Sequence, residues 1–200
     1  MKDHILAERL DMQALPGLLL DSMVDVSEAI KAIRLGEFTS CWLAEQLFYQ
    51  AGVSPGRFRQ SELDKDESFF DTPKALAALH CFEAMIESGA CQEGLVSYLW
   101  KSMGVRNQAW LSALLEKLSW NAALILLLTR PNGTVFHRNH STSSDSLLCR
   151  LEAIPDEVII SFAQENGCYS QLYHLTHNKS LLQAAGSADR DSVMLTDLGL

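Results

Sequence analysis

The sequence predicts an all-α protein, either a compact helical bundle or a set of stacked helical hairpins, with about eight or nine helices. Apolar residues recur at helical spacing along most of the chain. Glycines stand where such stretches end, and prolines stand where they begin. Only residues 134–136, in a segment rich in turn residues, have the composition of a short strand. These observations favour helices over sheets.

Nine segments have helical periodicity. They are residues 3–14, 22–35, 40–51, 55–62, 73–88, 92–103, 107–129, 155–165 and 171–185. Glycine is favoured just past a helix because the residue after the last turn often takes a positive φ. The glycines that follow helical stretches here are Gly36, Gly52, Gly89, Gly104, Gly133, Gly167 and Gly186.

The helix predicted at 73–88 has a well-defined start. Thr72 and Pro73, after Asp71, provide a capping oxygen and a proline whose missing N–H costs nothing in the first turn. One apolar stripe follows, formed by Ala75, Leu79, Phe82 and Ile86. These features together predict a buried amphipathic helix.

The helix predicted at 155–165 begins with Pro155, Asp156 and Glu157. Carboxylates in a first turn interact favourably with the helix dipole. The apolar residues Val158, Ile159 and Phe162 follow at helical spacing.

An uncharged run of twelve residues, Leu118 to Thr129, ends the segment predicted at 107–129. A helix needs about 20 apolar residues to cross a bilayer, whereas one of roughly 10 to 14 is more often a buried core helix. Lys117 and Arg130 bound the run. We therefore expect the core helix of a water-soluble protein and no membrane insertion.

The chain, 200 residues long, is expected to form one all-α domain over residues 1–186, with a possible small N-terminal helical subdomain over 1–65. Residues 131–146 combine turn residues with serines and predict a surface loop. Residues 187–200 have mixed polarity and are predicted to form a flexible C-terminal tail. Because charged residues interrupt any apolar run near the amino terminus, no cleaved secretion signal is expected and the cytoplasm is the expected location.

The cysteines and histidines form no recognisable metal-binding or catalytic pattern. Two His-x-x-His pairs, at 137–140 and 174–177, could be placed around zinc with Cys149 and Cys168, but nothing in the sequence enforces that geometry, and surface histidines are expected. The cysteines are widely spaced, without a Cys-x-x-Cys pair, which predicts free thiols; they are Cys41, Cys81, Cys91, Cys149 and Cys168. Hydrolase and nucleotide-binding glycine motifs are also missing. We expect no catalytic residue, metal or cofactor, and an enzyme with an unfamiliar site stays an alternative.

Residues 43–67, LAEQLFYQAGVSPGRFRQSELDKDE, have the pattern of a helix-turn-helix. Gly52 stands at the turn, and Val53 and Phe58 occupy inward apolar positions. From Ser40 to Lys65 the segment resembles the TetR family of bacterial transcription regulators, whose Ala-Gly-Val-Ser motif is matched by residues 51–54. The resemblance implies an all-α chain with a small DNA-binding domain followed by a ligand-binding and dimerisation domain.

The TetR resemblance also implies which residues would contact DNA. Arg57, Arg59 and Gln60 would face a groove or phosphates, and their side chains suit guanine and backbone contacts. The chain departs from the family at Arg59 and Glu62, where aromatic residues are expected. Its 25 acidic residues against 16 basic ones, a net charge of −9, oppose binding to phosphates. An ordinary packing corner between two helices is the competing interpretation.

Two segments resemble parts of an ankyrin repeat. Residues 72–90 have a Thr-Pro start and a terminal Gly-Ala, and residues 121–137 resemble the second helix and turn of such a unit. The spacings between Gly89, Gly133 and Gly167 are unequal, at 44 and 34 residues. A stacked array requires several equal repeats. An ankyrin-like helical repeat binder is therefore the third candidate.

Aromatic residues exceed what helix formation requires, and tryptophan and tyrosine often anchor interfaces. Phe69 and Phe70 follow an acidic turn, so at least one of these rings is expected at the surface. We predict a non-enzymatic protein–protein interaction module, such as an adaptor, regulatory subunit or chaperone-like partner. The predicted partner-binding residues are Phe69, Phe70, Trp100 and Trp42. The expected partner is another protein, with a possible homodimer; DNA is the partner only under the TetR-like interpretation.

Overall fold

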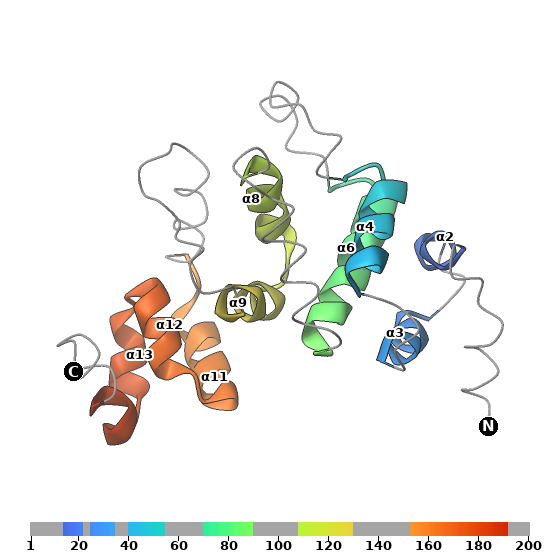
Figure 1. The fold of residues 1–200 in the computed structure, drawn as a ribbon. Helices are drawn as coiled ribbons and strands as arrows, with labels where there is room; N and C mark the ends of the chain where they lie inside the picture. Colours follow the sequence, from blue (N-terminus) through green and yellow to red (C-terminus); the bar gives the residue numbers. More distant parts are fainter. Residues whose placement is uncertain are drawn as a thin grey trace. The chain divides into compact units, whose positions relative to one another are not determined.

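A computed structural model describes residues 14–21, 25–34, 40–54, 70–89, 108–129 and 153–191 (Figure 1). These residues form helices, caps and turns with no strand among them, which confirms the all-α class. The helices are α2 (Leu15–Leu20), α3 (Val26–Arg34), α4 (Ser40–Gln50), α6 (Pro73–Glu87), α8 (Gln108–Lys117), α9 (Trp120–Leu128), α11 (Asp156–Asn166), α12 (Tyr169–Thr176) and α13 (Lys179–Ala184). With a short helical segment at 187–191, the described ranges hold ten helices, slightly more than predicted.

The chain divides into two compact units, Met1–Val135 and Phe136–Leu200. Both are acidic: 17 acidic residues face 12 basic ones in the first unit, and 8 face 4 in the second. The expectation of one domain over residues 1–186 stays a prediction, since two compact units can fold together as one domain. The tail predicted from residue 187 begins as helix rather than coil, at residues 187–191.

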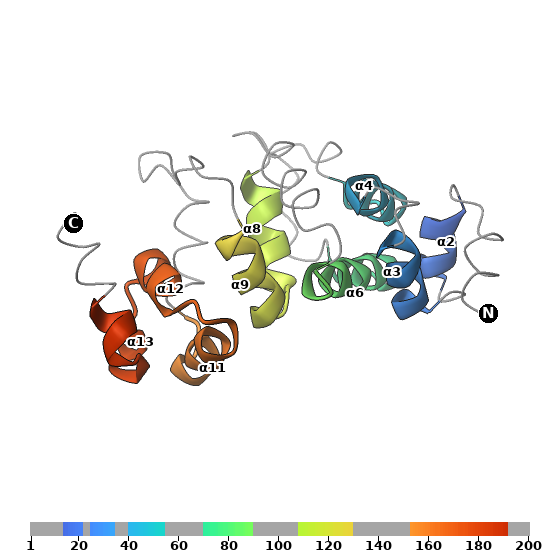
Figure 2. The same ribbon diagram turned by 60° about the horizontal axis from the view of Figure 1, so that its bottom comes forward.

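Helix α6 is the central helix of the first unit. It contacts α2, α3, α4 and α9, and Figure 2 shows it between them. As predicted, Thr72 caps its start: the Thr72 side chain accepts a hydrogen bond of 3.2 Å from the Ala75 N–H, and Pro73 follows in the first turn. Its buried face consists of Ala75, Ala78, Leu79, Cys81, Phe82, Met85 and Ile86. Because α6 is one continuous helix, the segment does not contain the helix pair of an ankyrin unit.

An aromatic cluster joins α4, α6 and α8 in the core. The Phe48 ring lies 5.1 Å from the Phe82 ring and 5.3 Å from the Trp110 ring, both in edge-on geometry. The Trp110 indole Nε1 donates a 2.6 Å hydrogen bond to the Val53 carbonyl. This bond satisfies two buried polar groups and fixes the corner after α4 against α8.

The corner after α4 is a tight turn, which the helix-turn-helix interpretation and an ordinary packing corner both require. Gly52 takes a positive φ of 80°, a conformation that disfavours residues with a Cβ atom. The Val53 N–H then donates to the Phe48 carbonyl at 2.9 Å. Val53 is buried, as predicted. Phe58 and the second helix predicted at 55–62 lie outside the described residues.

The segment predicted as one helix over 107–129 is two helices, α8 and α9. The chain breaks at Ser119, whose side chain caps α9 by accepting a 3.2 Å hydrogen bond from the Ala122 N–H. The apolar residues of α9 are mostly buried, which confirms the expected core helix. Among the described residues, no helix has both the length and the apolar character needed to span a bilayer.

Helices α11, α12 and α13 build the described part of the second unit and contact one another. Gly167 ends α11 with a φ of 60°. The segment predicted as one helix over 171–185 is interrupted at His177, which has a φ of 51°. Asn178 then caps α13 by accepting a 2.8 Å hydrogen bond from the Ser180 N–H, so two short helices replace the predicted one.

Other boundaries also differ from the prediction. The described chain begins just where the helix predicted at 3–14 ends, and α2, at Leu15–Leu20, was not predicted. The helix predicted at 92–103 lies outside the described residues, as does the loop predicted at 131–146.

Asp156 links the starts of α11 and α13, as two hydrogen bonds show. The Asn178 side-chain amide donates to its carboxylate at 2.9 Å, and the Ser180 hydroxyl donates at 2.5 Å. These bonds, first that from Ser180, lower the pKa of Asp156. Its stabilising contribution is therefore complete above the carboxyl's ordinary pKa of about 3.9 and is lost as the pH falls through the lower folded-state value.

We expect Asp156→Asn to lower the thermal unfolding midpoint of the second unit at pH 7 and to flatten its decline below about pH 4. Circular dichroism between neutral and acidic pH measures both effects. Glu157→Gln, in the same first turn, is the matched control because it removes one exposed carboxylate without touching the Asn178 and Ser180 bonds. Equal acid sensitivity of wild type and Asp156→Asn would contradict this role.

Candidate functional site

The outward side of α4 carries aromatic and acidic residues in one line. We call it the α4 outer face, and it consists of Trp42, Glu45, Gln46 and Tyr49. Residues at spacings of three, four and seven lie on the same side of a helix. The opposite side of α4 is buried in the core through Leu43, Ala44, Leu47 and Phe48. The α4 outer face is therefore the side that the core does not use.

Tyr49 is the most exposed large apolar side chain among the described residues. It is 51% exposed, and the second such residue, Leu76 on α6, is 37% exposed. Glu45 is exposed one turn before Tyr49, and Trp42 is half-buried at the start of the line. An exposed tyrosine aligned with a tryptophan is the residue combination that often carries binding energy at interfaces.

Of the predicted partner-binding residues, the structure places Trp42 on the α4 outer face and Phe70 in the core. Trp42 belongs to the α4 outer face, as a surface role requires. Phe70 does not lie at the surface: it is 1% exposed, and its ring lies 6.2 Å from the Trp110 ring. This corrects the expectation for Phe70, because a contact with a helix distant in sequence buries it. Phe69 and Trp100 lie outside the described residues.

Arg57, Arg59 and Gln60, the residues implied in DNA contact, also lie outside the described residues. The turn before them, with a positive φ at Gly52 and a buried Val53, fits both the TetR-like interpretation and an ordinary packing corner.

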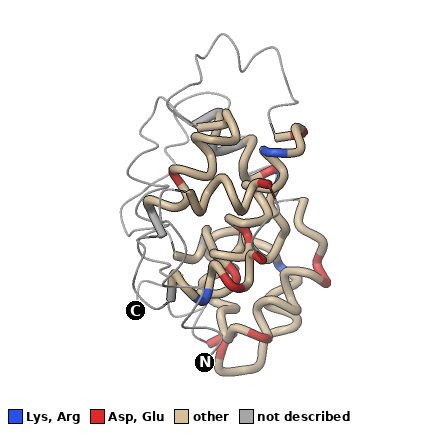
Figure 3. Tube along the Cα trace, turned by 90° about the vertical axis from the view of Figure 1, so that its right-hand side faces the viewer, with Lys and Arg blue, Asp and Glu red and all other residues tan. Residues whose placement is uncertain are grey.

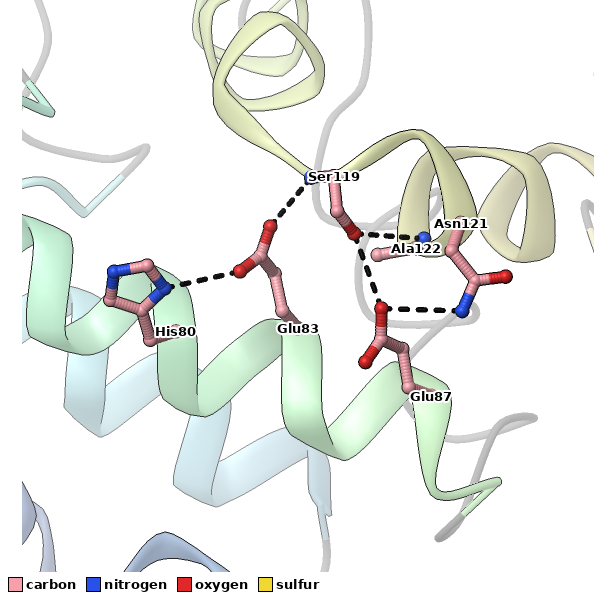
Figure 4. A network of polar contacts seen from close by, with 6 residues as sticks. All are labelled: His80, Glu83, Glu87, Ser119, Asn121 and Ala122. Atoms are coloured by element: carbon pink, nitrogen blue, oxygen red, sulfur yellow. Dashed lines mark hydrogen bonds and ion pairs between the residues drawn. The ribbon is translucent and has the colours of Figure 1, made fainter. Parts of the chain in front are cut away.

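A polar network joins α6 to the start of α9 (Figure 4). Glu83 Oε1 accepts a 2.6 Å hydrogen bond from the Ser119 N–H, and Glu87 Oε1 lies 3.2 Å from the Ser119 hydroxyl. The Asn121 amide donates to Glu87 Oε1 at 3.3 Å. His80 Nδ1 lies 3.2 Å from Glu83 Oε2. Glu83 thus accepts a backbone N–H at the start of α9, where an isolated helix leaves its first donors unsatisfied. Glu87 accepts from two side chains of the same end, the Ser119 hydroxyl and the Asn121 amide.

This network has the residue types of a hydrolase triad but another arrangement. The Ser119 hydroxyl accepts the Ala122 N–H and contacts Glu87, whereas His80 is directed to Glu83 (Figure 4). A nucleophilic serine requires a base within hydrogen-bond reach of its own oxygen. Capping α9 and joining it to α6 account for these contacts of Ser119, so the network is structural.

The described thiols are poor nucleophiles. Burial raises the pKa of the Cys81 thiol to about 11 and also raises that of Cys168. In the second unit, His174 and His177 lie within about 6 Å of the Tyr173 ring by centroid distance, which makes an aromatic group rather than a set of ligands. Within the described part of the chain, no three potential ligands gather as a metal site requires.

We expect native Cys81 to react with iodoacetamide at pH 8 on the order of 100-fold more slowly than the same thiol in urea, because an ordinary thiol has a pKa of about 8.5. Since Cys81 is only 3% exposed, burial adds to this protection. Mass spectrometry of the Cys81 peptide after timed labelling measures both rates. Labelling of the native chain at the rate of the unfolded one would contradict a buried, protonated thiol.

Acidic residues predominate along the described trace (Figure 3). Helix α4 itself contains Glu45 and no lysine or arginine. No ion pair joins Glu45 to another residue that the structure describes. The α4 outer face therefore presents two aromatic rings and the exposed carboxylate of Glu45, which no described lysine or arginine pairs. In comparisons with protein families, curated proteins and solved structures, this chain finds no match.

Proposed function

We propose that the protein is a non-enzymatic binding module, acting in the cytoplasm, whose α4 outer face engages another protein. The observation that carries the proposal is the 51% exposure of Tyr49 in line with Trp42 and Glu45. A tyrosine side chain that is half-exposed in the folded chain offers ring surface that a partner gains binding energy from covering.

The surroundings of α4 support a binding role, because the side of the helix opposite the α4 outer face is packed into the core. Leu47 and Phe48 are fully buried, and α4 contacts both α2 and α6 (Figure 2). The turn that follows α4 is fixed by the hydrogen bond from Trp110 to the Val53 carbonyl. A rigid helix presents its side chains without a large entropy cost on binding, which favours affinity.

Site-specific photo-cross-linking tests this proposal. The photoreactive residue p-benzoylphenylalanine replaces Tyr49 in one variant and Lys31, an exposed residue of α3 in the same unit, in a second. After irradiation in cells, the Tyr49 variant is expected to form a defined adduct with another protein, and the Lys31 variant is expected to form none. Denaturing gels and mass spectrometry identify the adduct.

Three outcomes of the cross-linking would contradict the proposal. They are adducts of the same kind from both positions, adducts only with a second copy of the chain, and no adduct from Tyr49. The first would show unspecific collision, the second would show self-association, and the third would show that nothing binds the α4 outer face.

DNA binding is the second candidate function, and the corner at Gly52 and Val53 favours it. The φ of 80° at Gly52 and the burial of Val53 are what the TetR-like interpretation requires of the turn. A mobility shift with genomic DNA at low salt tests it, with Arg57→Ala and Arg59→Ala as variants. Salt-sensitive binding lost in both arginine variants would rank this function first; unchanged migration of DNA would remove it.

A further inference from the structure

We infer that the partner segment seated on the α4 outer face is basic, with arginine or lysine side chains placed over Trp42 and Tyr49 and beside Glu45. The inference rests on the proposed function and names the chemistry of the partner. Its basis is the order of side chains along the helix, ring, carboxylate, ring, with Tyr49 half-exposed and Glu45 exposed.

The spacing of the three side chains suits this chemistry. Trp42 and Tyr49 are seven residues apart, which corresponds to about 10.5 Å along a helix axis, and Glu45 lies between them. A guanidinium group stacks on an aromatic face and at the same time donates hydrogen bonds to a neighbouring carboxylate. One arginine therefore contacts a ring and Glu45 together, and a second basic residue reaches the other ring.

Charge complementarity favours a basic partner segment over an acidic or a purely apolar one. An acidic segment would be repelled by Glu45 and by a unit with 17 acidic and 12 basic residues. A purely apolar segment would cover the Glu45 carboxylate without a donor, which is costly for a charged group. A basic segment gives that carboxylate a partner, and the field of the acidic unit accelerates its approach.

Selection from a library of random 12-residue peptides displayed on phage tests the inference. Peptides are selected on the wild-type chain and depleted on Tyr49→Ala. Because both chains have the same charge, depletion removes peptides held only by general attraction to an acidic protein. The peptides that remain are expected to be enriched in arginine and lysine.

Affinities of one selected peptide then test each element of the α4 outer face. By the size of a cation–π contact and a surface ion pair, we expect Tyr49→Ala and Glu45→Gln each to weaken binding about five-fold. Tyr49→Phe keeps the ring and is expected to stay within about two-fold of wild type. Glu116→Gln, at an exposed position of α8, is the matched charge control and is expected to change affinity less than about two-fold.

Three results would overturn the inference. Retained peptides that are neutral or acidic would leave the proposed function in place and exclude a basic partner. Equal weakening by Glu116→Gln and Glu45→Gln would show that overall charge, and not this face, attracts the peptide. If no peptide is recovered whose binding depends on Tyr49, the inference is contradicted. The proposed function is tested separately, by the photo-cross-linking from Tyr49.

Discussion

Phe82→Ala is expected to lower the free energy of unfolding of the first unit by about 3–5 kcal/mol. Phe82 is 0% exposed at the centre of α6 and packs edge-on against Phe48. Its removal leaves a cavity where α4 and α6 meet, which rigid neighbours fill only in part. Urea unfolding followed by tryptophan fluorescence measures the loss, because Trp42, Trp100, Trp110 and Trp120 all belong to this unit.

Leu76→Ala provides the matched control for Phe82→Ala. Leu76 lies on the same helix but is 37% exposed and has a smaller side chain, so its truncation removes less buried surface than that of Phe82. We expect a change of less than about 1 kcal/mol. Comparable losses from the two substitutions would contradict the described position of the core.

Trp110→Phe is expected to cost about 2–4 kcal/mol, which combines a smaller ring with a lost hydrogen bond. The indole Nε1 is the donor for the Val53 carbonyl at 2.6 Å, and phenylalanine has no group to replace it. A buried carbonyl left without a donor carries most of its desolvation cost. Urea unfolding followed by circular dichroism measures the change, since fluorescence loses one of its reporters. A loss below about 0.5 kcal/mol would show that this bond does not hold the corner after α4.

The sequence was informative where a local rule determines structure. Thr72 and Pro73 start α6 as predicted, and Pro155 with Asp156 starts α11 within one residue of the prediction. Caps and first-turn prolines act through neighbouring backbone groups, so they can be recognised without knowledge of the fold. Such caps and first-turn prolines predicted the starts of these two helices and supported the all-α fold class.

Breaks within continuous apolar patterns were not predicted. Ser119 lies in an uncharged run whose periodicity continues on both sides, so its capping role was hidden. The break at His177 depends on a positive φ at a residue that is not glycine, which sequence rules do not expect. In both cases a polar side chain caps the second helix: Ser119 caps α9 and Asn178 caps α13.

In the candidate site too, local sequence predicted some features, whereas others depend on contacts between residues distant in sequence. The polar residues before Phe70 suggested exposure, but Trp110, 40 residues later, packs over it. Tyr49 is not among the predicted partner-binding residues, although its position on the outward side of α4 follows from the sequence. Leu43, Ala44, Leu47 and Phe48 define the buried side of α4, and this leaves Trp42, Glu45 and Tyr49 on the other side. The outward side of α4 can be identified only after its buried apolar side has been assigned.

The affinity of the cross-linked partner for two alanine variants tests the central claim most directly. Tyr49 and Leu76 are the two exposed large apolar side chains of the described residues, and they lie on different helices of one unit. If the α4 outer face is the binding surface, Tyr49→Ala weakens binding about 30-fold or more, as loss of an interface anchor does. Leu76→Ala then stays within about three-fold of wild type. Wild-type affinity in Tyr49→Ala, or an equal loss in both variants, would contradict the assignment.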